Sequence, residues 1–286
     1  MAATLLFIAM NASVKWLSAS LHPVELIWAR CTGQLLFVLF AFAPRYGGWR
    51  LFVTRRPLVQ VGRSVCQLAS TSMFITAIGK VPLADATSIS FSAPLIVAAL
   101  AGPVLGERVS RLQWLAIATG FGGALLIIRP TGGAANLWAL LILGSAFFYA
   151  GYQILTRTVA GVDPPQTSVL YSALAGGVVL SAIVPFFWKT PNGWLQWLLF
   201  ASLGVVGGIS HYFVARAFSY GRAAVISPFH YVQLIWASLA GYLIFAHLPS
   251  AWTWLGAVVI IGSGLLIALD EAATPTGPKL RRRRPG

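Results

Sequence analysis

The feature that most constrains this chain is a series of ten apolar windows, each near the length of a helix that crosses a bilayer. The windows cover residues 2–21, 24–43, 57–79, 83–105, 111–128, 137–156, 166–188, 194–218, 223–245 and 252–269. Proline, glycine and charged residues separate them, and the connections are too short to hold a soluble domain. We therefore predict an all-α membrane protein with ten transmembrane helices.

The composition agrees with lipid as the solvent. Hydrophobic residues make up 58% of the 286 residues and charged residues 9%, and the mean hydropathy is +0.79, which a soluble domain of this length does not reach. The net charge of +14 at first suggests nucleic acid, but the cations lie between apolar stretches, as in other basic membrane proteins. We expect a lipid bilayer around the chain and no nucleic-acid partner.

The basic residues predict the orientation, because cations resist translocation and stay in the cytoplasm. Fourteen Lys and Arg lie on the side of the two termini, and only Lys80, Arg129 and Lys189 lie opposite. Both termini are therefore expected to be cytoplasmic. The opening stretch has no basic residue ahead of its apolar run, so we expect a first spanning helix, with a few native residues before Met1, rather than a cleavable signal peptide.

An internal repeat divides the chain. Residues 74–100 can be laid on residues 213–239 without a gap, so that Phe, Ala, Ser, Leu-Ile, Ala and Leu coincide. Because each half has five helices, the second half enters the membrane from the opposite side, which makes two inverted repeats around a central cavity. The predicted divisions are a first repeat, a short extracytoplasmic linker, a second repeat and a basic cytoplasmic tail, over 1–130, 131–136, 137–270 and 271–286.

The fourth and fifth windows carry a pattern that is similar to a known family. Pro94 is followed by Leu105-Gly106-Glu107-Arg108, then by Gln113-Trp114 and Gly120. With these residues the chain resembles the EamA-type ten-helix exporters of the drug/metabolite transporter superfamily over essentially its whole length, and among them most resembles the bacterial aromatic amino-acid exporters. The resemblance implies a secondary transporter of the bacterial inner membrane that exports its substrate by alternating access.

Three cations lie inside the apolar windows, namely Lys15, Arg30 and Arg63. A cation at the bilayer centre costs about 2.5–3.5 kcal/mol on insertion scales, so these side chains should face protein or water. Lys15 shares a helix face with Asn11, and Arg63 shares one with Gln67, because residues four apart lie on the same side of a helix. Arg30 is expected either to face the cavity or to pair with an acid, Glu25 or Asp85.

The sixth window has a polar stripe that includes Tyr149, Tyr152 and Gln153. In the repeat register used here, Asn11 falls on Tyr149 and Lys15 on Gln153, so both halves turn a polar face to corresponding places. In the eighth window Gly204 and Gly208 share a face with His211, a spacing typical of close helix packing.

The fourth and ninth windows add polar and aromatic residues beside a proline, which frees backbone carbonyls at membrane depth. Histidines in the eighth and ninth windows have two readings, a direct substrate or proton role and a hydrogen-bonded packing role. The residues predicted to line the substrate cavity are Asn11, Lys15, Arg63, Gln67, Phe91, Tyr149, Tyr152, Gln153, His230 and Tyr231.

The charge of this cavity predicts its substrate. No acid lies nearer the midplane than Glu25 and Asp85, so the cations should attract anions or carboxylates, and ring stacking adds about 0.5–1.5 kcal/mol for an aromatic substrate. We expect export of aromatic or large neutral amino acids, or of similar carboxylate-bearing metabolites. A carrier for phosphorylated compounds and a channel-like facilitator remain as alternatives.

The sequence argues against an enzyme. Its four histidines are scattered and form no HExxH motif, and the chain has no phosphate-binding loop of the Gly-x-x-x-x-Gly-Lys-Ser/Thr kind. Cys31 and Cys66 have no metal-ligand spacing and lie within apolar windows. We expect no catalytic residues, no metal and no cofactor, a monomer rather than an oligomer, and facilitated efflux with proton coupling left open.

Overall fold

The computed structural model describes residues 2–106, 109–129, 134–159, 162–220 and 231–273. Within these ranges every regular element is a helix. The α-helices are α1 Ala2–Leu17, α2 Pro23–Tyr46, α3 Pro57–Ile78, α4 Leu83–Ser90, α5 Ala93–Leu105, α6 Arg111–Ile128, α7 Ala134–Val159, α8 Pro165–Ile183, α9 Gly193–Tyr220, α11 Gln233–Phe245 and α12 Ala251–Ala273. Two short 3₁₀ helices are η1 Gly48–Phe52 and η2 Val184–Phe187.

Seven helices in the described part of the chain are long and apolar enough to cross a membrane. These are the helices over Pro23–Tyr46, Leu83–Leu100, Arg111–Ile128, Leu137–Val159, Pro165–Phe187, Gly193–Phe213 and Ala251–Asp270. Helices α1 and α11 are apolar but shorter, and the 22 residues of α3 include Arg63 and two glutamines. The chain is thus a multi-pass helical membrane protein, and each of the ten predicted windows overlaps a described helix.

The fourth predicted window is a broken helix. Helix α4 ends at Ser90 and α5 begins at Ala93, one residue before Pro94, whose ring does not fit the interior of a continuous helix. The hydroxyl groups of Ser88 and Ser92 are buried beside the break, and neither has a hydrogen-bond partner among the residues that the structure describes. The expected effect of proline at membrane depth is therefore seen here as an interruption of the backbone.

Side chains cap the start of α2. His22 accepts from the backbone amide of Val24 and Glu25 accepts from that of His22, which satisfies free N–H groups at the start of α2. The Oε1 atom of Glu25 also accepts from the backbone amide of Lys189 at 3.0 Å. Through Oε1, Glu25 thus links the start of α2 to the connection between α8 and α9.

Two pairs of glycines let helices cross at backbone contact. A Cβ atom on Gly204 of α9 would lie 2.3 Å from the Gly33 backbone of α2, and one on Gly256 of α12 would lie 2.5 Å from the Gly123 carbonyl oxygen of α6. A Cβ on Gly208 would lie 2.8 Å from the Phe37 ring. The packing role predicted for Gly204 and Gly208 is confirmed.

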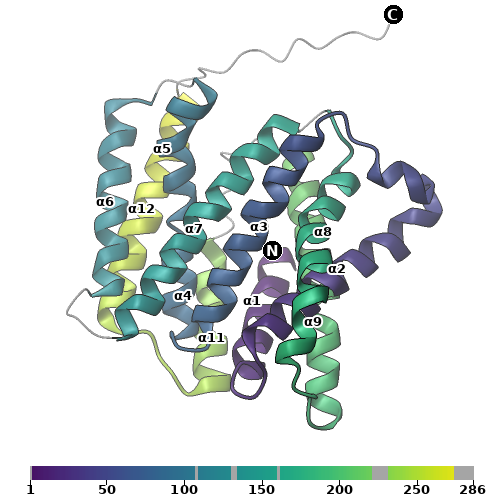
Figure 1. Ribbon diagram of the computed structural model, residues 1–286. Coiled ribbons are helices and arrows are strands. Elements are labelled where there is room, and N and C mark those ends of the chain that lie inside the picture. The colour runs from purple at the N-terminus through teal and green to yellow at the C-terminus, as the bar shows by residue number, and fades with distance from the viewer. Residues whose placement is uncertain (1, 107–108, 130–133, 160–161, 221–230, 274–286) are drawn as a thin grey trace, which may run out of the picture.

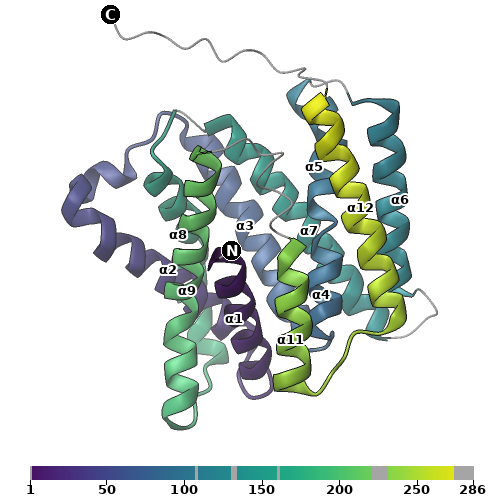
Figure 2. The same cartoon turned by 180° about the vertical axis from the view of Figure 1, so that it is seen from behind.

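The helices form a bundle with two edges and a middle. Figures 1 and 2 show α6 and α12 along one edge and α2, α8 and α9 along the other, with α1, α3, α4, α7 and α11 between them. Helix α3 packs on α7 and α8, whereas α1 packs on α9 and α11. The intramembrane cations lie on two of the middle helices, α1 (Lys15) and α3 (Arg63), and on the neighbouring edge helix α2 (Arg30).

Candidate functional site

The interior of the bundle holds a group of polar and aromatic side chains from α2, α3, α7 and α9. We call this group the arginine–tyrosine cluster, and its members are Arg30, Arg63, Gln67, Thr71, Tyr149, Tyr152 and His211. Arg63 is only 1% exposed, and Arg30 and Gln67 are each 7% exposed. Two cations are therefore held inside the protein, away from lipid and from bulk water, as the sequence predicted.

Arg63 binds neutral groups on three helices. Its Nε donates to Thr156 Oγ1 of α7 at 2.8 Å, and its Nη1 donates to Gln60 Oε1 of α3 at 2.6 Å. Its Nη2 donates to Ser172 Oγ of α8 at 3.4 Å. The guanidinium carbon also lies 4.8 Å from the centroid of the Tyr152 ring, within cation–π range. Arg63 therefore joins α3 to α7 and α8 as well as placing positive charge in the interior.

Gln60 connects Arg63 to the connection between α7 and α8. The Nε2 of Gln60 donates to Asp163 Oδ2 at 2.8 Å, and the same oxygen accepts from Thr54 Oγ1 at 2.5 Å. The backbone amide of Arg55 donates to Asp163 Oδ1 at 3.1 Å. Burial raises the pKa of Asp163, but these hydrogen bonds and the charge of Arg55 outweigh it, so that the pKa lies below its ordinary value.

Arg30 pairs with uncharged polar groups rather than with an acid. Its Nη1 donates to Thr71 Oγ1 at 2.5 Å, and its Nη2 lies 3.1 Å from His211 Nε2. Because a guanidinium only donates, His211 Nε2 must accept in this contact, which places the ring proton on Nδ1. Of the two readings left open by the sequence, pairing with Glu25 or Asp85 is not the arrangement found.

Two buried polar atoms at this position have no hydrogen-bond partner in the described part of the chain. They are Nε of Arg30, a donor, and Oε1 of Gln67, an acceptor. Both side chains bind the same hydroxyl group, that of Thr71, since Gln67 Nε2 donates to it at 3.1 Å. Buried polar groups are normally paired, so these two atoms mark a place where a bound molecule would find a donor and an acceptor.

Tyr149 and Tyr152 form a stacked aromatic wall on α7. Their ring centroids are 5.7 Å apart and the ring planes are 20° from parallel. Ser172 Oγ lies 3.4 Å from Tyr152 Oη, and the guanidinium of Arg63 lies over the Tyr152 ring. The tyrosine pair therefore extends an aromatic surface along α7 from Arg63.

Lys15 is engaged with the backbone. Its Nζ donates to the carbonyl oxygens of Ile78 at 2.9 Å and of Val81 at 2.6 Å, and it lies 5.5 Å from the centroid of the Phe245 ring. Asn11 is half-buried one helical turn earlier on α1. These two predicted residues share a helix face, and the contacts found for Lys15 within the described residues are with the end of α3, the following turn and the Phe245 ring.

The remaining predicted residues lie on α7 and beside α4 and α11. The rings of Phe91 and Tyr231 are in edge contact, with centroids 5.2 Å apart, so they join the break after α4 to the start of α11. Gln153 is half-buried on α7 next to Tyr152. His230 lies outside the described residues.

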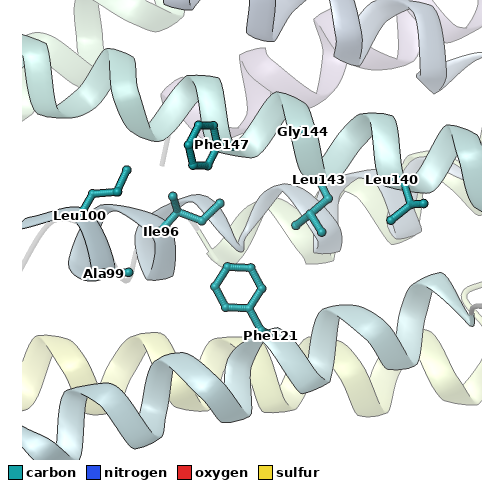
Figure 3. Close-up of a pocket in the computed structure, with 8 residues that line it drawn as sticks. All are labelled: Ile96, Ala99, Leu100, Phe121, Leu140, Leu143, Gly144 and Phe147. Carbon is teal, nitrogen blue, oxygen red and sulfur yellow. The ribbon is translucent and has the colours of Figure 1, made fainter.

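A separate apolar cavity of 430 Å³ opens between α5, α6 and α7, as Figure 3 shows. Its lining residues are Ile96, Ala99, Leu100, Phe121, Leu140, Leu143, Gly144 and Phe147. Leu140 and Phe147 are about half exposed, so the cavity opens on the outside of the bundle, where lipid chains would lie. It contains no residue of the predicted substrate site.

Sequence reasoning missed the partners that hold the arginines. Thr71 lies four residues after Gln67 and so shares its helix face, a spacing that was available in the sequence. The contact of Arg30 with His211 and the link from Arg63 through Gln60 to Asp163 join residues far apart in the chain, and one sequence gives no signal for them. Among the residues described, no group of three or more His, Cys, Asp or Glu side chains is placed to hold a metal ion.

Comparison with known proteins identifies the family. The sequence model of the EamA-like transporter family matches residues 1–129 and again residues 136–269. The chain belongs to the EamA-like transporter family. The resemblance noted at the fourth and fifth windows is thereby confirmed at the level of this family and of the drug/metabolite transporter superfamily.

Relatives of known function are also membrane transporters. A riboflavin transporter of Vibrio cholerae is 33% identical over 211 residues, which cover 71% of this chain and 67% of the relative. An S-adenosylmethionine uptake transporter of Rickettsia felis is 29% identical over 90% of this chain and 86% of its own length. The pseudopaline exporter CntI of Pseudomonas aeruginosa is 29% identical over 91% of this chain and 90% of its own length.

These three names agree on transport and differ in substrate and direction. None of the three refers to an aromatic amino acid, so the finer resemblance to aromatic amino-acid exporters has no support from them. A solved crystal structure covers 96% of this chain and 99% of its own, with a TM-score of 0.65 and 19% identity. At that identity the likeness concerns the fold alone.

Proposed function

We propose that this EamA-like transporter is a secondary carrier that moves a ring-bearing, carboxylate-containing metabolite across the bacterial inner membrane by alternating access. An aromatic or large neutral amino acid is the simplest such substrate, and efflux down its gradient is the expected direction. The observation that carries this proposal is the arginine–tyrosine cluster. Its two buried guanidinium groups have neutral partners and lie beside stacked tyrosine rings.

The proposed carrier has two inverted halves of five helices each. Two features support this arrangement. First, one family model matches the chain twice in succession. Second, the contacts between helices are symmetric if α1, α2 and α3 correspond to α7, α8 and α9. Helix α3 packs on α7 as α9 packs on α1, and α3 packs on α8 as α9 packs on α2. A carrier of this kind opens its central site to one face at a time as the halves rock.

The observed helix ends favour a different alignment of the two repeats. In it, each residue of α1 corresponds to a residue of α7 that lies four positions later than in the alignment derived from the sequence. Helix α1 ends at Leu17 and α2 begins at Pro23, while α7 ends at Val159 and α8 begins at Pro165. Aligning these ends brings Asn11 opposite Gln153 instead of Tyr149. A shift of four residues keeps the same helix face, so both halves still turn polar residues toward the proposed cavity.

The chemistry of the cluster favours an anionic head group and an aromatic body. An arginine binds carboxylate strongly through charge-assisted hydrogen bonds, and the unpaired Nε of Arg30 supplies such a donor. The unpaired Oε1 of Gln67 accepts an N–H group, as the amine of an amino acid offers. The stacked rings of Tyr149 and Tyr152 provide a flat surface for an aromatic ring.

The relatives' substrates are compatible with a ring-binding site. Riboflavin and S-adenosylmethionine, which give two relatives their names, each contain a planar heteroaromatic ring, and S-adenosylmethionine also carries an amino-acid group. A phosphate ester is a poorer candidate, because phosphate recognition normally uses several convergent cations. In this structure Arg63 is held by four side chains, which leaves Arg30 as the cation with an unpaired donor.

Efflux from proteoliposomes tests this proposal. Vesicles are loaded in parallel with labelled phenylalanine, S-adenosylmethionine, riboflavin and a sugar phosphate, and retention is compared with protein-free vesicles. We expect loss of phenylalanine, of S-adenosylmethionine or of both, since these compounds carry a ring and a carboxylate, and retention of the sugar phosphate. Rapid loss of the sugar phosphate with phenylalanine retained would overturn the substrate assignment. The proposed orientation is tested separately with a fluorescent protein fused to the C-terminus, which should fluoresce in the cytoplasm.

A further inference from the structure

Lys15 caps the end of a neighbouring helix. Its ammonium group donates to the carbonyl oxygen of Ile78, the last residue of α3, and to that of Val81 in the turn that follows. The last carbonyls of a helix have no partner within the helix, and a cation is favourable there because the helix dipole is negative at this end. One side chain of α1 thus holds the connection between α3 and α4 in place.

Three helix ends converge at this point. Helix α1 ends at Leu17, α3 at Ile78 and α11 at Phe245, and Lys15 lies against the Phe245 ring. The packing is close, since a Cβ atom on Gly79 would lie 2.7 Å from the hydroxyl oxygen of Ser18. In the proposed orientation these ends face the outside of the cell, so the contact closes the bundle on that side.

The second half has a basic residue at the corresponding position. Aligning the ends of α1 and α7 places Lys15 opposite Arg157, because each lies two residues before the end of its helix. In the proposed orientation Arg157 is near the cytoplasmic face. Its side chain is exposed, whereas Lys15 is half-buried. The two equivalent cations are therefore in different states, as alternating access requires of paired gates.

We propose that Lys15 and Arg157 are the two gating residues, or latches, of the transport cycle: each holds one exit of the cavity closed. Lys15 closes the outer exit by capping α3, and Arg157 closes the inner exit by capping α9, the counterpart of α3, when the carrier turns outward. The structure then represents the state in which the outer exit is closed. Lys15 acts by positioning helices and does not touch the substrate. This inference rests on the alternating access of the proposed function.

The test measures access to the cavity without any substrate. A single cysteine replaces Asn11, one turn inward of Lys15, in a Cys31→Ser, Cys66→Ser background, and a membrane-impermeant maleimide is applied from either face. Lys15→Met, which keeps the side-chain length but removes the donor, should raise the labelling rate from outside several-fold. Lys15→Arg keeps a cationic donor and should stay near the parent rate.

Two further variants complete the design. Arg157→Met should act in the opposite sense, with slower labelling from outside and faster labelling in inverted vesicles. Lys80→Met is the matched control, because Lys80 is an exposed cation in the same turn and should leave both rates unchanged. Labelling after denaturation in detergent gives the amount of protein in each membrane, which corrects for variants that insert poorly.

The outcomes separate the latch from a substrate-binding role. If Lys15→Met leaves labelling from both faces unchanged and only raises the KM for transport, Lys15 is a ligand and the latch proposal is overturned. The proposal would also be overturned if Lys15→Met and Arg157→Met changed the labelling rates in the same direction from each face. Failure of phenylalanine efflux would contradict the proposed substrate, but it would not change the labelling result, since no substrate is present.

Discussion

The guanidinium carbon of Arg63 lies 4.8 Å from the centroid of the Tyr152 ring, deep in the bundle where neither lipid nor bulk water reaches it. Tyr152 in turn stacks on Tyr149. Positive charge and aromatic surface are therefore continuous between α3 and α7. This continuity is what a site for a ring with an anionic head group requires.

Replacing Arg63 tests its structural part in this arrangement. Arg63→Met should lower the stability of the protein in detergent by about 1–3 kcal/mol for each buried partner left unpaired, Thr156 and Gln60 first. Arg63→Lys should be intermediate, because an ammonium group cannot reproduce the planar set of donors. Thermal unfolding followed by tryptophan fluorescence measures both.

A matched control for this series is Arg56→Met. Arg56 also spans two helices, since its Nη1 donates to the Thr158 carbonyl oxygen at 2.9 Å, but that contact is exposed. We expect a change below about 1 kcal/mol, as for other exposed polar contacts. Equal losses for the Arg56 and Arg63 variants would show that the buried contacts of Arg63 have no special weight.

The sequence predicted the helical, membrane-spanning class well because apolar length and loop charge are local signals. It also put Arg63 and Gln67 on one face of their helix, and Tyr149 and Tyr152 on one face of theirs, since residues three or four apart share a helix face. It did not predict how Arg30 and His211 meet. That contact depends on the crossing of α2 with α9, which is set by Gly33 and Gly204 and which no local pattern reveals.

Lys15 illustrates the opposite case, in which a correct local inference led to an incomplete role. A lysine in an apolar helix does require polar partners, and the sequence offered a substrate as the partner. In the structure, two partners of Lys15 are backbone carbonyls, one at the end of α3 and one in the following turn. Helix ends make such partners available, but their position in space follows only from the fold.

The crossing of α2 and α9 gives a second prediction. Gly204→Ala should lower stability by about 1–3 kcal/mol or more, the range for overpacking, because the added Cβ would meet the Gly33 backbone, which cannot turn aside as a side chain does. Gly122→Ala on α6 is the control, since no atom of the described residues lies within 4 Å of its added Cβ. Thermal unfolding in one detergent compares them, and a Gly204→Ala protein as stable as the parent would contradict the close crossing.

Asp163 predicts a dependence of stability on pH. Burial alone would raise its pKa, but hydrogen bonds from Thr54, Gln60 and the Arg55 amide lower it below the ordinary value. A carboxyl group whose pKa is depressed on folding stabilises the protein above its unfolded pKa, which is about 4, and loses that contribution as the pH falls through the folded value. The parent protein should therefore lose stability below about pH 4.

Asp163→Asn isolates this contribution. The variant should be less stable than the parent at pH 7, and the difference should shrink as the pH is lowered toward 3, because the parent carboxyl becomes protonated. Unfolding temperatures across this pH range measure the difference. A difference that stays constant from pH 7 to pH 3 would show that the charge of Asp163 makes no contribution.

The central claim, a carrier for ring-bearing carboxylates that uses the arginine–tyrosine cluster, is tested most directly by counterflow. Proteoliposomes loaded with unlabelled phenylalanine are diluted into a trace of labelled phenylalanine, with no ATP present. We expect a transient accumulation of label above its equilibrium level, and loss of most of that accumulation with Gln67→Leu, which removes the unpaired acceptor. Label that only equilibrates would indicate a channel, and counterflow unchanged by Gln67→Leu would contradict the proposed site.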